Sequence, residues 1–144
     1  MRNKESLSYL AAWSGGARAL GALRGVSKTG TRMVIFDHVN RGSYDSHALL
    51  DAGKPFLPNP PLLSQFPAVL EASGWKVETI EEAHDSYVRW YTNLVSRIAL
   101  KRPEIVALAG LAGYDHVLSL YRGLLKAALQ NDLGAAFIRA TPKE

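Results

Sequence analysis

The stretch KTGTRMVIFDHVN, residues 28–40, decides the fold class. Its centre, Met33–Phe36, is a continuous apolar run rich in residues that favour β-structure. Such a run is typical of a strand that is covered on both faces, as in parallel sheets. The run ends in three polar side chains, which are Asp37, His38 and Asn40. We therefore predict a strand over residues 31–37 with polar groups gathered at its end.

A helical pattern precedes this strand, because apolar residues recur there at spacings of three and four. They are Leu7, Leu10, Trp13, Ala17, Leu20 and Leu23. We expect a helix over residues 5–24. Gly15 and Gly16 lie inside the pattern, and each glycine costs about 1 kcal/mol relative to alanine in a helix. Two shorter helices that meet at these glycines fit the pattern nearly as well.

Two further strands and several helices follow the first strand. Residues 75–80 alternate apolar with polar side chains, and residues 134–140 form a closing β-type run. The helical patterns cover residues 62–72, 84–101, 104–112 and 115–130. This order predicts an α/β fold, with a small three-stranded mixed sheet and about five helices in a single domain of residues 1–144.

A long connection, residues 40–61, separates the first strand from the next helix. It holds two glycines and four prolines, and we expect one helical turn near residues 45–51. Few apolar anchors are evident in it. We therefore expect this loop to be the most mobile internal segment unless a ligand or partner covers it.

Composition excludes several classes of protein. The chain has 144 residues, is 47% hydrophobic and 21% charged, and has a net charge of +4, so a globular domain is expected. Its basic residues are scattered, which argues against a nucleic-acid partner. There is no cysteine, and therefore no disulfide or thiolate site. No apolar run is long enough for a membrane span or uninterrupted enough for a signal peptide, so we expect a cytoplasmic protein without a membrane partner.

Several stretches resemble class I S-adenosylmethionine-dependent methyltransferases of the small-molecule type. LGALRGVSKTGTRMVIFDHVN, residues 20–40, is similar to their LRPGGRLVIFD-type helix, turn and strand, although Thr29 and Thr31 replace the usual proline and second glycine. VLEASGWKVETIEEAHDSYVRWY, residues 69–91, resembles the next helix, glycine turn and strand. Residues 84–130 resemble the lid helices of that family, and LGAAFIRATP, residues 133–142, its last strand, which is antiparallel. The resemblance implies that this last strand lies at the centre of the three.

The resemblance covers only the C-terminal half of that family's fold. A strand followed by a G-x-G loop, which holds the cofactor, is nowhere in the sequence, and neither is the acidic residue that binds the ribose. We therefore expect no cofactor in the isolated chain, and S-adenosylmethionine only where a complementary half is supplied. An active enzyme would be a methyltransferase completed by a partner chain.

The candidate site residues follow from the end of the first strand and from the lid helices. At the strand end, His38 is a candidate general base toward an acceptor hydroxyl or amine, with Asp37 beside it. The alternative is that both are polar strand-end residues that cap a loop. The candidate substrate-binding residues are Asn40, Tyr87, Trp90, Tyr91, Tyr121 and Arg122. Most of these rings share a helical face and fit a core role as well, whereas Trp90 falls off that face. No H-x-x-x-H pair is present, so we predict no metal site.

Three functions fit these observations. The chain is a methyltransferase-like half domain that needs a complementary chain, a binding module for a small molecule or protein on the same scaffold, or a truncated product stable only as an oligomer. The strand at residues 31–37 lacks one neighbour, and open strand edges are rarely left bare. We expect a homodimer through this edge or a complementary N-terminal half, with residues 1–14 folded over the edge as an alternative.

Overall fold

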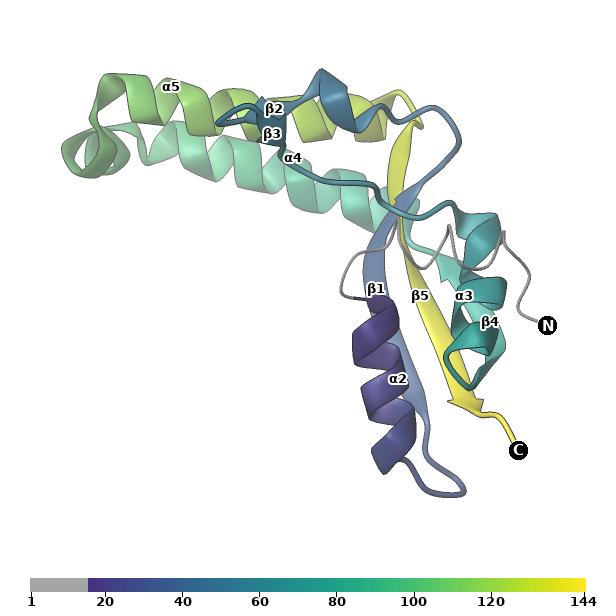
Figure 1. The fold of residues 1–144 in the computed structure, drawn as a ribbon. Helices are drawn as coiled ribbons and strands as arrows, with labels where there is room; N and C mark the ends of the chain where they lie inside the picture. The colour runs from purple at the N-terminus through teal and green to yellow at the C-terminus, as the bar shows by residue number, and fades with distance from the viewer. Residues whose placement is uncertain (1–15) are drawn as a thin grey trace.

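The computed structural model describes residues 16–144, which form a sheet with two covering helices and a long helical hairpin (Figure 1). The four α-helices of this part are α2 (Gly16–Val26), α3 (Phe66–Ala72), α4 (His84–Leu100) and α5 (Arg102–Leu129). The strands are β1 (Met33–Asn40), β2 (Leu50–Asp51), β3 (Lys54–Pro55), β4 (Trp75–Glu82) and β5 (Leu133–Pro142), and the 3-10 helices are η1 (Ser46–Ala48) and η2 (Leu63–Gln65). The helix expected over residues 5–24 begins outside the described residues, and its described part continues to Val26.

The main sheet has the order β1-β5-β4, so the last strand is central, as predicted. Both pairings are antiparallel, with Phe36 of β1 opposite Phe137 of β5. The expectation of a mixed sheet is wrong for the described residues. β1 and β4 run in the same direction, but β5 lies between them, and a mixed sheet would need a parallel neighbour beside β1. β1 also continues three residues beyond the predicted end, because Asn40 still pairs with Leu133.

One face of this sheet is packed against α2 and α3. Trp75 begins β4 and is 1% exposed, and its indole N–H donates to the backbone oxygen of Leu20 in α2 at 2.9 Å. The buried residues of this core are Leu20, Val39, Phe66, Val69, Leu70, Trp75, Ala136, Ile138 and Ala140. Burial of each large apolar side chain stabilises the fold by about 1.5–3 kcal/mol. This core fixes β1, and with it the direction in which Phe36 and His38 point.

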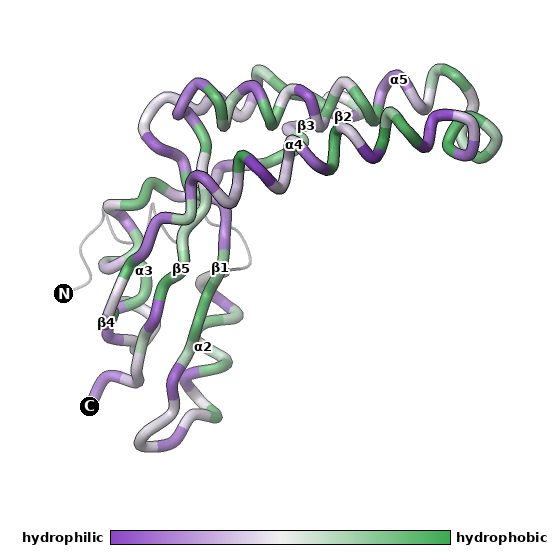
Figure 2. Tube along the Cα trace, turned by 180° about the vertical axis from the view of Figure 1, so that it is seen from behind, coloured by the Kyte–Doolittle hydropathy of each residue, from purple (hydrophilic) through white to green (hydrophobic). Residues whose placement is uncertain are grey.

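The helices α4 and α5 form an antiparallel hairpin that crosses the other face of the sheet and extends past β1 (Figures 1 and 2). The two helices expected at residues 104–112 and 115–130 are one helical element, α5, which is interrupted at Gly110 (φ 76°, ψ 170°). No helix of the described residues is both long and apolar enough to cross a membrane.

The connection after β1 is more ordered than its composition suggests. It contains the expected helical turn, η1, and a short antiparallel hairpin of β2 and β3 that was not predicted from the sequence. The expectation of few apolar anchors is wrong, because the loop contributes four partly buried side chains to the core under the hairpin of α4 and α5 (the lid hairpin). They are Tyr44, Leu49, Phe56 and Leu57.

Candidate functional site

An apolar pocket lies where α4 crosses the sheet, on the face opposite α2 and α3. Its volume is about 340 Å³, within the range of small-molecule sites. The lining residues are Phe36, His38, Ala83, Ser86, Tyr87, Trp90, Tyr91 and Phe137. Five of these eight residues are Phe, Tyr or Trp, and His38 is the only histidine among them. The pocket therefore combines an apolar wall with one ring that can accept a proton.

Two periodicities bring these side chains together. Phe36 and His38 are two residues apart on β1 and point to the same face of the sheet. Tyr87 and Tyr91 share the buried face of α4, and Trp90, at the exposed border of that face, lines the pocket beside them. Phe36 packs against Phe137 of the neighbouring strand, with ring centroids 4.7 Å apart. The Trp90 ring lies edge-on to Tyr91 at 4.8 Å and is 58% exposed. Trp90 thus forms the solvent-facing rim of the pocket.

The polar contact inside this wall joins His38 to Tyr87. The Nδ1 atom of His38 lies 2.7 Å from the Tyr87 hydroxyl oxygen. Burial lowers the pKa of His38 below its ordinary value of 6.5, and the charge of Asp37 opposes this shift without cancelling it. Burial, together with the neighbouring Tyr91 hydroxyl, raises the pKa of Tyr87. At neutral pH the pair is therefore an uncharged imidazole beside a protonated phenol.

Asp37 points away from this pair. The side-chain Oδ1 atom of Asp37 accepts the backbone N–H of His38 at 2.7 Å, and the residue is not part of the pocket lining. Its contribution to the pocket is the electrostatic effect on the pKa of His38.

The other predicted binding residues take different positions. Tyr121 stands behind the lining, with its ring 6.4 Å from Tyr91 and 5.6 Å from Phe56. Arg122 is exposed on α5 and does not line the pocket. Asn40 organises the following loop, because its Oδ1 atom accepts the N–H groups of Gly42 and Tyr44. Phe36 and Phe137 also line the pocket but were not predicted, and only Phe36 could have been found from the sequence, because it lies two residues from His38 on the same face of β1.

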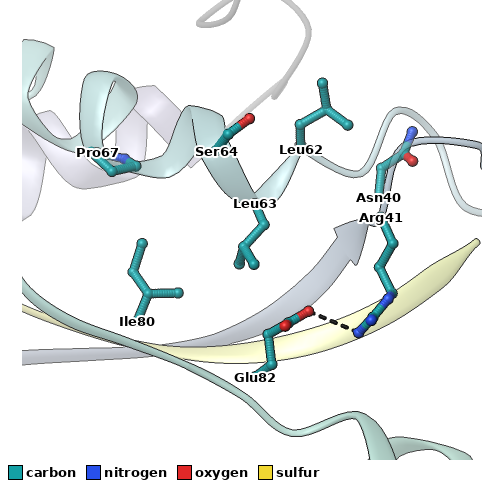
Figure 3. A pocket seen from close by; sticks show the side chains of 8 residues that line it. All are labelled: Asn40, Arg41, Leu62, Leu63, Ser64, Pro67, Ile80 and Glu82. Atoms are coloured by element: carbon teal, nitrogen blue, oxygen red, sulfur yellow. Dashed lines mark hydrogen bonds and ion pairs between the residues drawn. The ribbon is translucent and has the colours of Figure 1, made fainter. Parts of the chain in front are cut away.

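A second hollow lies at the end of β1 and β4, next to η2 (Figure 3). It has a volume of about 620 Å³ and is lined by Asn40, Arg41, Leu62, Leu63, Ser64, Pro67, Ile80 and Glu82. Its two charged groups pair with each other, because Arg41 donates to Glu82 at 2.8 Å (Figure 3). The charges are thereby neutralised, and the hollow offers less chemistry than the aromatic pocket. The described residues also contain no group of three side chains able to hold a metal ion.

No protein-family model matches the sequence, and none of the curated proteins matches it. Solved structures do match. A cyclopropane synthase from Mycobacterium tuberculosis has a TM-score of 0.73 at 10% identity, over 86% of this chain and 48% of that one. Phosphoethanolamine N-methyltransferase 2 from Haemonchus contortus, in complex with phosphomonomethylethanolamine and S-adenosylhomocysteine, has a TM-score of 0.69 at 15% identity, over 90% of this chain and 30% of that one. The cyclase SpnF has a TM-score of 0.66 at 20% identity, over 89% and 44%.

The chain has the fold of the C-terminal part of small-molecule, S-adenosylmethionine-dependent methyltransferases. It spans about half the length of the cyclopropane synthase and of SpnF, and less than a third of the nematode enzyme. The likeness concerns the fold, since the matched structures include a cyclase as well as a methyltransferase.

The described residues do not form the cofactor cradle of that methyltransferase fold. β1 leads into Arg41-Gly42-Ser43 and β4 leads directly into Ala83 and α4, so neither β1 nor β4 is followed by a glycine-rich loop. Gly42 does have a positive φ of 123°, but it stands alone between Arg41 and Ser43 and its backbone N–H donates to the side-chain oxygen of Asn40 at 2.8 Å. The described residues after β1 and β4 therefore offer S-adenosylmethionine no glycine-rich loop, and the aromatic pocket is a candidate site in this part of the fold.

Proposed function

We propose that this chain is the acceptor-binding half of a small-molecule methyltransferase. One observation carries the proposal: the neutral His38–Tyr87 pair opens onto an aromatic pocket, within the fold of the C-terminal part of such enzymes. The rings suit a largely apolar acceptor, and the pair suits an acceptor that has one hydroxyl or amine group. The elements that bind the methyl donor come from another chain or from a further segment of a longer one.

Each residue has a distinct task in this proposal. Phe36, Phe137 and Trp90 bury the apolar body of the acceptor and exclude water from it. His38 takes the proton of the acceptor hydroxyl or amine, because its lowered pKa leaves it neutral and able to accept a proton at pH 7. Tyr87 fixes the imidazole ring: when Nδ1–H donates to the Tyr87 oxygen, the Nε2 atom is left as the base.

Calorimetry tests the missing donor site. Titration of the purified chain with S-adenosylmethionine should give no binding at micromolar concentrations, because neither β1 nor β4 of the described residues leads into a glycine-rich loop that could approach the cofactor. A one-site isotherm with a micromolar dissociation constant would contradict the proposed division into two halves.

Nuclear magnetic resonance tests the acceptor site with 2-naphthol, an apolar ring with one hydroxyl. The indole N–H signal of Trp90 and the ring signals of His38 should shift in a saturable manner. Phe137→Glu should abolish these shifts, and Leu108→Glu, on an exposed position of α5, should leave them intact. Shifts that persist in Phe137→Glu would place the probe elsewhere and count against the pocket.

A binding module without chemistry is the second candidate, and the poor fit to the methyl donor favours it. The two candidates differ in whether a separate chain that binds the methyl donor exists beside this one. A neighbouring reading frame that encodes a glycine-rich strand, loop and helix of about a hundred residues would favour the enzyme. Its product, mixed with this chain, should then bind S-adenosylmethionine, and binding by neither half alone nor by the mixture would favour the module.

A further inference from the structure

The outer edge of β1 is open over a short window. Asn40 donates its backbone N–H to Pro61 at 2.9 Å on the side away from β5, and it bridges to Leu62 there. Because backbone groups alternate in direction along an antiparallel strand, His38, Phe36 and Val34 also point outward. The N–H of His38 is held by the side chain of Asp37. In the described part of the chain no strand lies beside Val34 and Phe36, so these two residues form the free window.

Apolar side chains surround this window on both faces of the sheet. On the face of α2, Leu23 is 49% and Val26 is 78% exposed, and on the face of α4, Val34 is 60% and Phe36 is 57% exposed. A hollow of about 440 Å³ runs between α2 and β1 and includes Leu23, Val26 and Val34 in its lining. An unpaired edge combined with apolar groups on both of its faces is typical of a surface that another chain covers.

The lid hairpin overhangs the same edge. In both views the hairpin of α4 and α5 extends beyond β1, so the sheet and the hairpin form an L (Figures 1 and 2). Phe36 of the free window lines the pocket under α4 together with Trp90 and Tyr91. A chain that pairs with β1 is therefore contacted by the sheet edge and lies under the hairpin.

We propose that, in the 144-residue chain on its own, this window binds a second copy of the chain by antiparallel pairing of β1 about a two-fold axis at Ile35. The window is self-complementary, because Val34 and Phe36 lie at equal distances on either side of Ile35. Val34 then faces Phe36 of the second copy, and each donates its outward N–H to the carbonyl oxygen of the other. Directly opposite residues point to the same face, so the apolar residues of each face meet their counterparts.

The second copy also extends the candidate site. Phe36 lines the aromatic pocket, and Val34 of the second copy is placed beside Phe36 on the same face of the sheet. The apolar floor of the pocket would thereby continue across the two-fold axis. The inference does not rest on the proposed function, and a donor-binding segment that pairs with β1 would compete with the second copy for the window.

Light scattering at micromolar concentration tests the assembly. The chain should have twice the mass of a monomer, and Val34→Lys should be monomeric with an unchanged circular dichroism spectrum, since Val34 is exposed in the single chain. The control Leu108→Lys, which changes an 89% exposed residue on α5, should remain dimeric. A monomeric mass of the unmodified chain would overturn the proposal, and so would a Val34→Lys dimer.

Cysteine pairing tests the register, because the chain has no cysteine of its own. Hydrogen-bonded antiparallel residues have Cα atoms about 5.5 Å apart, which a disulfide can bridge. An oxidised mixture of Val34→Cys and Phe36→Cys chains should therefore give a disulfide-linked dimer, whereas Val34→Cys alone should give little. Equal cross-linking by Val34→Cys alone would overturn the Ile35-centred register.

Discussion

The Nδ1 atom of His38 and the hydroxyl oxygen of Tyr87 lie 2.7 Å apart and join the end of β1 to the first turns of α4. Their rings meet edge-on, with centroids 5.5 Å apart. The contact is a polar link between the sheet and the lid hairpin inside an otherwise apolar wall. A change in the protonation of His38 therefore affects both the attachment of the lid and the candidate chemistry.

The first prediction concerns the pH dependence of stability. Burial lowers the pKa of His38 below 6.5 in the folded chain, so the unfolded state binds more protons on acidification. The free energy of unfolding should be fully maintained above about pH 6.5 and should fall as the pH decreases through the folded pKa. Urea unfolding at about pH 7 and about pH 5 measures the change.

Two variants assign this dependence to the buried ring. His38→Gln should reduce the loss of stability between the two pH values, and His47→Gln, which changes an exposed histidine, should leave it unaltered. An identical pH dependence in His38→Gln and the unmodified chain would show that His38 is not the group responsible.

The sequence predicts the elements better than their pairing. Sequence patterns identify two strands: the apolar run Met33–Phe36 predicts β1, and the alternation in residues 75–80 predicts β4. Each pattern reflects only which side chains of that one strand are buried. The antiparallel character of the sheet depends on which strands are neighbours, and periodicity carries no such information. The β2–β3 hairpin could not be predicted from periodicity, because its strands have two residues each and show no alternation.

The lining of the candidate pocket could be predicted only in part, because it depends on strand pairing as well as on periodicity within each element. His38, Tyr87, Trp90 and Tyr91 were selected from separate elements, and the structure brings all four to one pocket. Phe137 could not be added from sequence, since its place beside Phe36 follows from the register of β1 and β5. Arg122, which was also predicted to bind substrate, lies on the exposed side of α5 because of its helical phase.

The second prediction concerns the link between α2 and the sheet. Trp75→Phe removes the N–H that donates to Leu20 in the core. The loss of a buried hydrogen bond should lower the free energy of unfolding by about 1–3 kcal/mol. Trp90→Phe is the matched control, because Trp90 is 58% exposed, and it should change stability by less than about 0.5 kcal/mol. Equal effects of the two variants in urea unfolding would contradict the assigned roles.

The third prediction divides the loop after β1 into two classes of amide. The N–H of Phe56 donates to Leu49 at 2.9 Å, next to side chains packed in the core under the lid hairpin. By contrast, Ala52 and Gly53 form the turn between β2 and β3 with positive φ values of 49° and 77°, and both are exposed. Hydrogen exchange should therefore be fast at Ala52 and Gly53 and markedly slower at Phe56. Uniform exchange along residues 42–58, whether fast or slow, would contradict this division.

The last prediction concerns the break in α5. Gly110 has φ 76° and ψ 170°, a conformation that is accessible essentially to glycine alone. A Cβ atom at Gly110 would meet no atom within 4 Å, so the cost of Gly110→Ala is backbone strain and not a clash. Gly110→Ala should therefore destabilise the chain by about 1–3 kcal/mol. Gly21→Ala, in the exposed interior of α2 with helical backbone and equally free space, should instead stabilise it by about 0.5–1 kcal/mol. Thermal or urea unfolding of the two variants should show opposite signs. A stabilising Gly110→Ala would contradict the non-helical break assigned to Gly110.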